Sequence, residues 1–173
     1  YRIDDPKPAP AGLSLVFDDG RLDFYASSLR YIDGPLDDAY DWRGDIMSDA
    51  WDAAVVRRRL KQHPDLLVCD ALLDQDLFAG VGNIIKNEVL FRIRVHPQST
   101  VGALPARKQG EMVKQARVYG GEFFAWKRDD VLGDHLCVHA QSTCPACGGR
   151  VRQAVLGRTK RRAFYCANCQ VRY

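Results

Sequence analysis

The chain has 173 residues, 46% of them hydrophobic and 27% charged, with a formal net charge of +3, a composition typical of one or two globular domains. No apolar stretch approaches the ~20 residues that a membrane-spanning helix needs, and no signal peptide opens the chain. We therefore expect a cytoplasmic protein without a membrane partner.

The first 43 residues predict a β-hairpin followed by a linker. LSLVF (residues 13–17) and RLDFYA (residues 21–26) are typical of strands, and the Asp-Gly pair between them is a common hairpin turn. Residues 31–49 are acidic and rich in turn residues, so we expect them to connect two domains. Because the chain begins with Tyr1 rather than Met, we also expect it to be part of a longer protein.

Helical spacing of apolar residues dominates the middle of the chain. It predicts a helix from about residue 51 to residue 63, with Ser48 or Asp49 as its N-cap. A pair of helices follows within residues 72–97, and a further helix is predicted over residues 106–126, after Leu104 and Pro105.

The helix pair is interrupted by the sequence AGVGN, residues 79–83. Gly80 and Gly82 allow a tight turn, and Asn83 falls at the start of the second helix with Lys86 one turn further on. Free amides at a helix start, together with an Asn and a Lys, are suited to binding an anion such as phosphate. The alternative is an ordinary helical hairpin.

The end of the chain carries a strong positive charge. Residues 1–52 contain five basic and twelve acidic residues, residues 53–134 contain thirteen and ten, and residues 135–173 contain seven and none. Such a segment typically binds a polyanion, most commonly nucleic acid. A solvated basic tail is the alternative.

Four of the six cysteines lie in this basic segment, with the spacing Cys-x2-Cys-x18-Cys-x2-Cys. The spacing predicts a structural zinc site with four thiolate ligands and no open position. Disulfides or a redox pair are the alternatives, but nothing indicates an oxidising compartment. The predicted ligands are Cys144, Cys147, Cys166 and Cys169.

A β-hairpin is predicted between the two cysteine pairs because apolar residues alternate there. It carries a basic run that is placed to contact phosphates, the alternative being a solvated charged face. The run consists of Arg158, Lys160, Arg161 and Arg162.

Two of these motifs together resemble one family. DQDLFAGVGNIIKNEVLFRIRVHP resembles the helix–two-turn–helix motif of the bacterial formamidopyrimidine-DNA glycosylase and endonuclease VIII family, and RRAFYCANCQ resembles the end of its zinc finger. The resemblance implies an α+β fold in three parts. These are a remnant of a β-sandwich with an acidic linker (1–43), a helical helix–two-turn–helix domain (44–134) and a zinc finger holding one structural Zn²⁺ (135–173).

The resemblance also implies which residues bind DNA. Asn83 matches the family's phosphate-binding Asn in the glycine turn, between Gly80, Gly82 and Lys86. Arg161 stands five residues before the third cysteine, where the family's zinc-finger Arg contacts phosphates beside the flipped-out nucleotide. Arg162 takes that role if the hairpin register differs by one residue.

Near the N-terminus, SSLRYI lies close to the family's loop that fills the gap left by the flipped base, which makes Arg30 and Tyr31 candidates. The implied partner is double-stranded DNA with a damaged or abasic site, bound by a monomer in the bacterial, nucleoid-associated cytoplasm.

The family's catalytic groups have no match in this chain. Its nucleophile is an N-terminal proline beside a glutamate, whereas this chain begins Tyr-Arg. We therefore expect no catalytic residue here. The first hypothesis is the DNA-clamping part of a glycosylase and AP lyase that excises oxidised bases in base excision repair. The alternative is a non-catalytic, zinc-dependent nucleic-acid-binding module.

Overall fold

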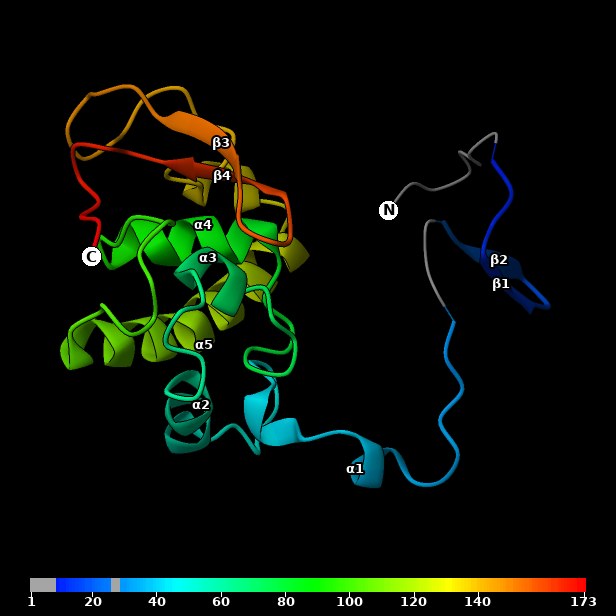
Figure 1. Ribbon diagram of the computed structural model, residues 1–173. Coiled ribbons are helices and arrows are strands. Elements are labelled where there is room, and N and C mark those ends of the chain that lie inside the picture. The colour runs from blue at the N-terminus through cyan, green and yellow to red at the C-terminus, as the bar shows by residue number, and fades with distance from the viewer. Residues whose placement is uncertain (1–8, 26–28) are drawn as a thin grey trace. The chain divides into compact units, whose positions relative to one another are not determined.

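The computed structural model describes residues 9–25 and 29–173. The chain divides into two compact units, residues 1–40 and 41–173 (Figure 1). Both helices and antiparallel hairpins are present, which confirms the predicted α+β class. Among the described residues, no helix has the length and apolar character to cross a membrane.

The first unit contains the predicted β-hairpin. Strands β1 (Leu13–Phe17) and β2 (Gly20–Phe24) pair antiparallel, and a short helix α1 (Leu36–Ala39) follows. The turn consists of Asp18 and Asp19, so glycine begins the second strand instead of forming the turn. The predicted end of that strand, Ala26, lies outside the described residues.

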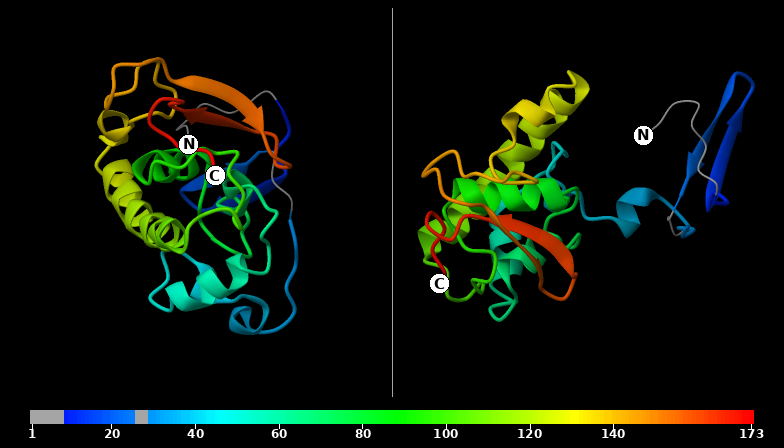
Figure 2. Two further views of the ribbon diagram at one scale, coloured as in Figure 1. Left: turned by 60° about the vertical axis from the view of Figure 1, so that its left-hand side comes forward. Right: turned by 90° about the horizontal axis from the view of Figure 1, so that it is seen from above.

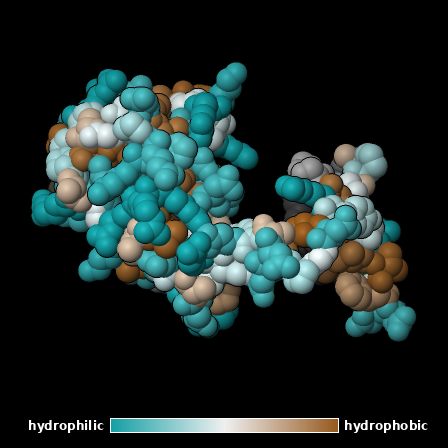
Figure 3. Space-filling view, turned by 60° about the horizontal axis from the view of Figure 1, so that its bottom comes forward, coloured by the Kyte–Doolittle hydropathy of each residue, from teal (hydrophilic) through white to brown (hydrophobic). Residues whose placement is uncertain are grey.

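Both strands of this hairpin leave apolar side chains in contact with solvent. Val16 is 75% exposed, Leu22 55% and Phe17 53%, and Figure 3 shows hydrophobic residues gathered on this unit. A two-stranded hairpin is at most marginally stable by itself. These side chains therefore contribute little burial energy within the unit.

The second unit is built from helices and one hairpin. In chain order its elements are η1 (Trp42–Gly44), α2 (Ala53–Leu60), α3 (Val68–Ala71), α4 (Asn83–Arg92), α5 (Ala106–Arg128), η2 (Leu132–His135), β3 (Arg152–Leu156) and β4 (Arg161–Tyr165). Helix α4 packs against both α5 and the β3–β4 hairpin (Figures 1 and 2). The hairpin thus forms one compact unit with the helices.

The main core lies where α2, α4 and α5 meet. Along α4, Ile85, Val89 and Leu90 are at most 5% exposed and recur at the spacing of one helical face. On α5, the predicted apolar positions Met112 and Val113 are at most 1% exposed. Burying each such side chain contributes roughly 1.5–3 kcal/mol, so this packing holds α4 against α5.

Two predicted helix boundaries were wrong. Helix α2 begins at Ala53 because Asp52 is its N-cap, with Oδ1 accepting from the backbone N–H groups of Ala54 (2.7 Å) and Val55 (3.2 Å). Ser48 instead accepts from the N–H of Ala50 in the preceding turn.

The predicted helix over residues 72–78 is a series of turns instead, because α3 ends at Ala71. Backbone bonds of single turns remain, such as Phe78 N–H to the Asp74 carbonyl at 2.8 Å, and side chains add further bonds to the backbone. Asp74 Oδ1 accepts from Asp76 N–H (3.0 Å), and the Gln75 amide bonds Gly80 N–H (3.0 Å) and the Val81 carbonyl (3.2 Å). The leucines of this segment had helical spacing because they are buried, not because they are helical.

Polar side chains buried in α4 hold both the β3–β4 hairpin and the segment that leads to the first cysteine loop, residues 137–139. Glu88 is 0% exposed, and its two carboxyl oxygens accept from the backbone N–H groups of Cys137 (3.0 Å), Val138 (2.9 Å) and His139 (2.7 Å). Asn87 Oδ1 accepts from the N–H of Phe164 in β4 at 3.2 Å.

The tip of the same hairpin is attached to Asp70 of α3, which is 3% exposed. Its carboxyl oxygens accept from the N–H groups of Arg158 (3.0 Å) and Thr159 (3.2 Å) and from the Thr159 hydroxyl (3.1 Å). Gly157 has φ +68°, and a Cβ there would lie 2.3 Å from Asp70 Oδ1. Only glycine allows this close approach.

Replacing Glu88 by alanine is expected to destabilise the protein by about 3 kcal/mol or more, because three backbone N–H groups lose their buried acceptor. Glu88→Gln should cost less, since one oxygen can still accept the bonds from Val138 and His139. Urea unfolding measures both. Glu111→Ala, which removes a partly exposed carboxylate, is the control and should cost less than about 1 kcal/mol. Equal losses for Glu88→Ala and the control would contradict this role.

Candidate nucleic-acid interface and metal centre

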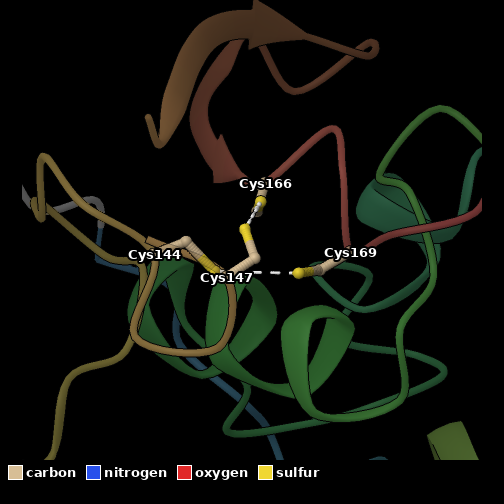
Figure 4. Close-up of side chains that lie close together, drawn as sticks. All are labelled: Cys144, Cys147, Cys166 and Cys169. Carbon is tan, nitrogen blue, oxygen red and sulfur yellow. Dashed lines mark hydrogen bonds between the residues drawn. The ribbon is translucent and has the colours of Figure 1, made fainter. Parts of the chain in front are cut away.

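The four predicted metal ligands converge at one point. Their Sγ atoms all lie within 4.8 Å of one another, with Cys147 and Cys166 3.5 Å apart and Cys144 and Cys169 3.8 Å apart. Figure 4 shows two side chains from the loop before β3 and two from the loop after β4. Four thiolates around a tetrahedral zinc ion with ~2.3 Å bonds would be about 3.8 Å apart, so the donor set fits a metal ion.

Each cysteine pair sits in a tight loop made by backbone hydrogen bonds. Cys144 N–H donates to the Gly149 carbonyl at 2.8 Å, and Gly148 N–H donates to the Cys144 carbonyl at 2.9 Å. Gly148 has φ +68°, which explains one of the two glycines there. After β4, Gln170 accepts from Cys166 N–H at 2.8 Å and donates to the Val95 carbonyl at 2.8 Å, which joins the second loop to the end of α4.

The first loop also favours a thiolate. The backbone N–H of Gly149 and the neighbouring thiols lower the pKa of Cys147 to about 7. The neighbouring thiols, Cys147 first, raise the pKa of Cys169 to about 12, because one thiolate disfavours the next. A bound cation would relieve that repulsion, and metal binding would release protons.

The predicted anion cradle lies at the start of α4. Gly80 has φ +87°, and Gly82 is the N-cap, with open space where a Cβ would stand. No side chain caps this helix, so the amides of its first turn have no intrahelical partner. A helix start of this kind favours negative charge.

Lys86 is buried, unlike a lysine on the protein surface. It is 1% exposed, and its ammonium group donates to Asn83 Oδ1 (2.8 Å) and to the Arg162 main-chain carbonyl (3.2 Å). Because the Asn83 oxygen is engaged, its NH₂ end is left as a donor for a ligand. Lys86 thus orients the cradle Asn and joins it to strand β4; direct phosphate contact by Lys86 stays a prediction.

Burial lowers the pKa of Lys86 to about 8. The Arg161 guanidinium acts in the same direction, while the Cys69 thiol and the Asp70 carboxyl oppose the shift, and about 8 is the net pKa. Keeping this buried ammonium group charged near neutral pH lowers the stability of the fold. Shifted pKa values of this kind are common at binding sites.

Arg161 and Arg162 are exposed neighbours in β4. Since side chains alternate along a strand, they point to opposite faces of the hairpin. Lys86 bonds the main-chain carbonyl of Arg162, the residue next to Arg161, so this part of β4 lies beside the cradle. Arg30 and Tyr31 are exposed residues of the first unit. Their role in filling the gap left by a flipped base stays a prediction.

Sequence reasoning missed three residues of this assembly, Asp70, Asn87 and Glu88. For Asn87 and Glu88, the sequence contained a signal. The polar triplet Lys-Asn-Glu, residues 86–88, lies within an otherwise apolar stretch of α4, and all three of its side chains are at most 1% exposed. Polar residues on the buried face of a helix must have internal partners.

The structure thus places a hairpin between two converging cysteine pairs beside the N-terminus of α4, with Arg161 and Arg162 on strand β4. The family described as "Formamidopyrimidine-DNA glycosylase H2TH domain" matches residues 44–118. The chain therefore carries the helix–two-turn–helix domain of the formamidopyrimidine-DNA glycosylase and endonuclease VIII-like family, to which it belongs.

Relatives include Endonuclease 8-like 3 of Mus musculus, 32% identical over 73% of this chain and 21% of the relative. Formamidopyrimidine-DNA glycosylase of Pasteurella multocida (strain Pm70) is 34% identical over 58% of this chain and 42% of that protein. The chain thus spans less than half of either relative.

Among solved structures, the formamidopyrimidine-DNA glycosylase of Lactococcus lactis, non-covalently bound to DNA containing an AP site, has a similar fold. The TM-score is 0.66 at 21% identity, over 73% of this chain and 48% of that one.

Removing the metal is expected to unfold the hairpin within residues 135–173 while the core of α2, α4 and α5 persists, because the hairpin's own apolar cluster is small. Cys166→Ser should lose about one equivalent of bound metal. Amide hydrogen exchange and metal analysis measure both effects. Cys69→Ala, which removes a buried cysteine outside the cluster, should keep the metal. Full hairpin protection after chelation would contradict a structural metal.

Lys86→Met should change how stability depends on pH. The folded pKa of Lys86, about 8, lies below its ordinary 10.5, so the unfolded state holds more protons between these values. The free energy of unfolding of the wild type should therefore rise relative to Lys86→Met from pH 8 to pH 10.5, by up to about 1.4 kcal/mol per pH unit. Urea unfolding at several pH values measures the difference. If the difference in the free energy of unfolding stays constant with pH, folding does not lower the pKa of Lys86.

Proposed function

We propose that this chain is the DNA-holding part of a DNA glycosylase and AP lyase that removes oxidised bases in base excision repair, with the catalytic residues outside it. One observation carries the proposal. The N-terminus of α4 and strand β4, 76 residues apart in sequence, are joined through Lys86, which contacts both Asn83 and Arg162. This link supports a single surface that includes both motifs expected to bind DNA.

The chemistry of that surface suits the sugar–phosphate backbone. The first-turn amides of α4 and the NH₂ group of Asn83 supply donors, and the Arg161 guanidinium supplies positive charge. The donors are uncharged or cationic, and they sit on rigid elements. Phosphates on both sides of a kink could thus be held without reading the base sequence. Duplex DNA with a damaged or abasic site is the partner we propose.

Zinc is the metal that we propose for the cysteine cluster. Four thiolates in a closed tetrahedral set favour Zn²⁺ over oxygen-seeking cations, and they leave no position for a substrate. Its role is to give the hairpin a fixed shape, so that the arginines of β4 keep their spacing from the cradle.

For the exposed hairpin of the first unit, we propose that it belongs to a larger β-structure. Its apolar side chains, among them Val16 and Phe17, are exposed on strands whose outer edges have no partner among the described residues. Exposed apolar surface of this kind favours association with further strands.

The binding proposal predicts that Arg161→Ala and Asn83→Ala each weaken binding to an abasic-site duplex by about tenfold. Asn83→Asp is the sharper test, because aspartate keeps the bond to Lys86 but places a negative charge in the cradle. It should bind DNA more weakly than Asn83→Ala while the protein stays folded. Fluorescence anisotropy measures affinity, and thermal unfolding checks the fold.

Arg58→Ala, an exposed arginine on α2, is the matched control and should bind normally. Affinity should also fall steeply with salt as counterions are released. Normal binding by both Arg161→Ala and Asn83→Asp would refute the proposed surface. Borohydride trapping of the intact protein, rather than of this chain alone, on an abasic duplex separates the enzyme from a non-catalytic module, since only a protein carrying the amine nucleophile forms a trapped covalent adduct.

A further inference from the structure

A groove runs beside the β3–β4 hairpin, between the hairpin and the two cysteine loops, with a volume of about 980 Å³. The role proposed for Arg161 does not use it, because Arg161 is not among its lining residues. Its wall is made of Arg150, Arg152, Gln153, Arg162, Phe164 and Asn168, with the loop 140–142 closing one side.

The groove is strongly cationic. Among the described residues, no carboxylate forms an ion pair with Arg150, Arg152 or Arg162, whereas Arg158 at the hairpin tip is paired with Asp74 at 2.9 Å. No acidic residue occurs between residues 135 and 173, so nothing within this segment offsets the three guanidinium groups. Unpaired arginines gathered in a hollow attract a polyanion.

Arg162 connects the groove to the anion cradle at the start of α4. Its main-chain carbonyl accepts from the Lys86 ammonium at 3.2 Å, which fixes this point of β4 beside the cradle. Its side chain lines the groove together with Phe164, two residues further along the same strand face. Arg161 points to the other face. Of the two neighbouring arginines, Arg162 lines the groove and Arg161 does not.

We propose that this groove binds the phosphodiester backbone of duplex DNA that continues past the cradle, with Arg150, Arg152 and Arg162 contacting phosphates. The inference rests on the proposed function and adds a second stretch of backbone to it. Neutral donors such as Gln153 and Asn168 are placed to supplement the arginines. Contacts of this kind add affinity without base specificity.

The test is the double variant Arg150→Ala/Arg152→Ala. Its charge-matched control is Arg57→Ala/Arg58→Ala, which removes two exposed arginines from α2. Each protein is titrated with abasic duplexes of about one helical turn and about three helical turns, centred on the lesion. We expect about tenfold weaker binding of the long duplex by the groove variant, with a salt slope smaller in magnitude by about 2. Binding of the short duplex should be nearly unchanged.

The outcomes separate this inference from the function on which it rests. If the wild type does not bind either duplex, the proposed function fails. If Arg161→Ala weakens binding but the groove variant binds the long duplex with the wild-type affinity and salt slope, only the groove is refuted. A loss confined to single-stranded DNA of the same length would also overturn the proposal, since it names duplex backbone as the occupant. An equal loss in the α2 control would show a general charge effect and contradict a groove site.

Discussion

The burial of polar side chains between the helices and the β3–β4 hairpin is the constraint on which the rest of the structure depends. Asp70 accepts backbone N–H groups from the tip of the hairpin, and Glu88 accepts them from residues 137–139, which lead to the first cysteine loop. Lys86 and Asn87 add bonds to β4. Such contacts tolerate little displacement, because a buried polar group without its partner costs roughly 1–3 kcal/mol. Apolar packing alone would allow the hairpin to slide, whereas these directional bonds specify one position.

The cysteine cluster and the buried contacts position the β3–β4 hairpin in two different ways. The cluster fixes the shape of the hairpin, because its two loops converge on one point. The contacts to α3 and α4 fix where that shape sits. Both are needed before Arg161 stands at a defined distance from the N-terminus of α4, and the phosphate-binding surface that we propose depends on that distance.

The arrangement carries a cost at Lys86. An ammonium group that is 1% exposed loses most of its hydration, and its pKa falls to about 8 as a result. A methionine would fill the same space without that penalty. The charge is retained where it holds the oxygen end of Asn83 and leaves the amide donors free, and local instability at such positions is common when binding requires it.

The sequence by itself determined the elements whose signals are local: the β1–β2 hairpin, helix α5, the spacing of the four cysteines and the glycine turn before Asn83. Those signals depend on side-chain period, turn chemistry and ligand spacing, which short stretches contain. Local periodicity was misleading over residues 72–78, where buried leucines lie in turns because Asp74 and Gln75 bond the backbone. Only the tertiary structure decided that Lys86 is buried, that Asp70 holds the tip of the hairpin, and that Glu88 holds the segment before the first cysteine loop. Each of these depends on partners 49 to 89 residues away, and a sequence pattern carries no information about which distant backbone groups will need an acceptor.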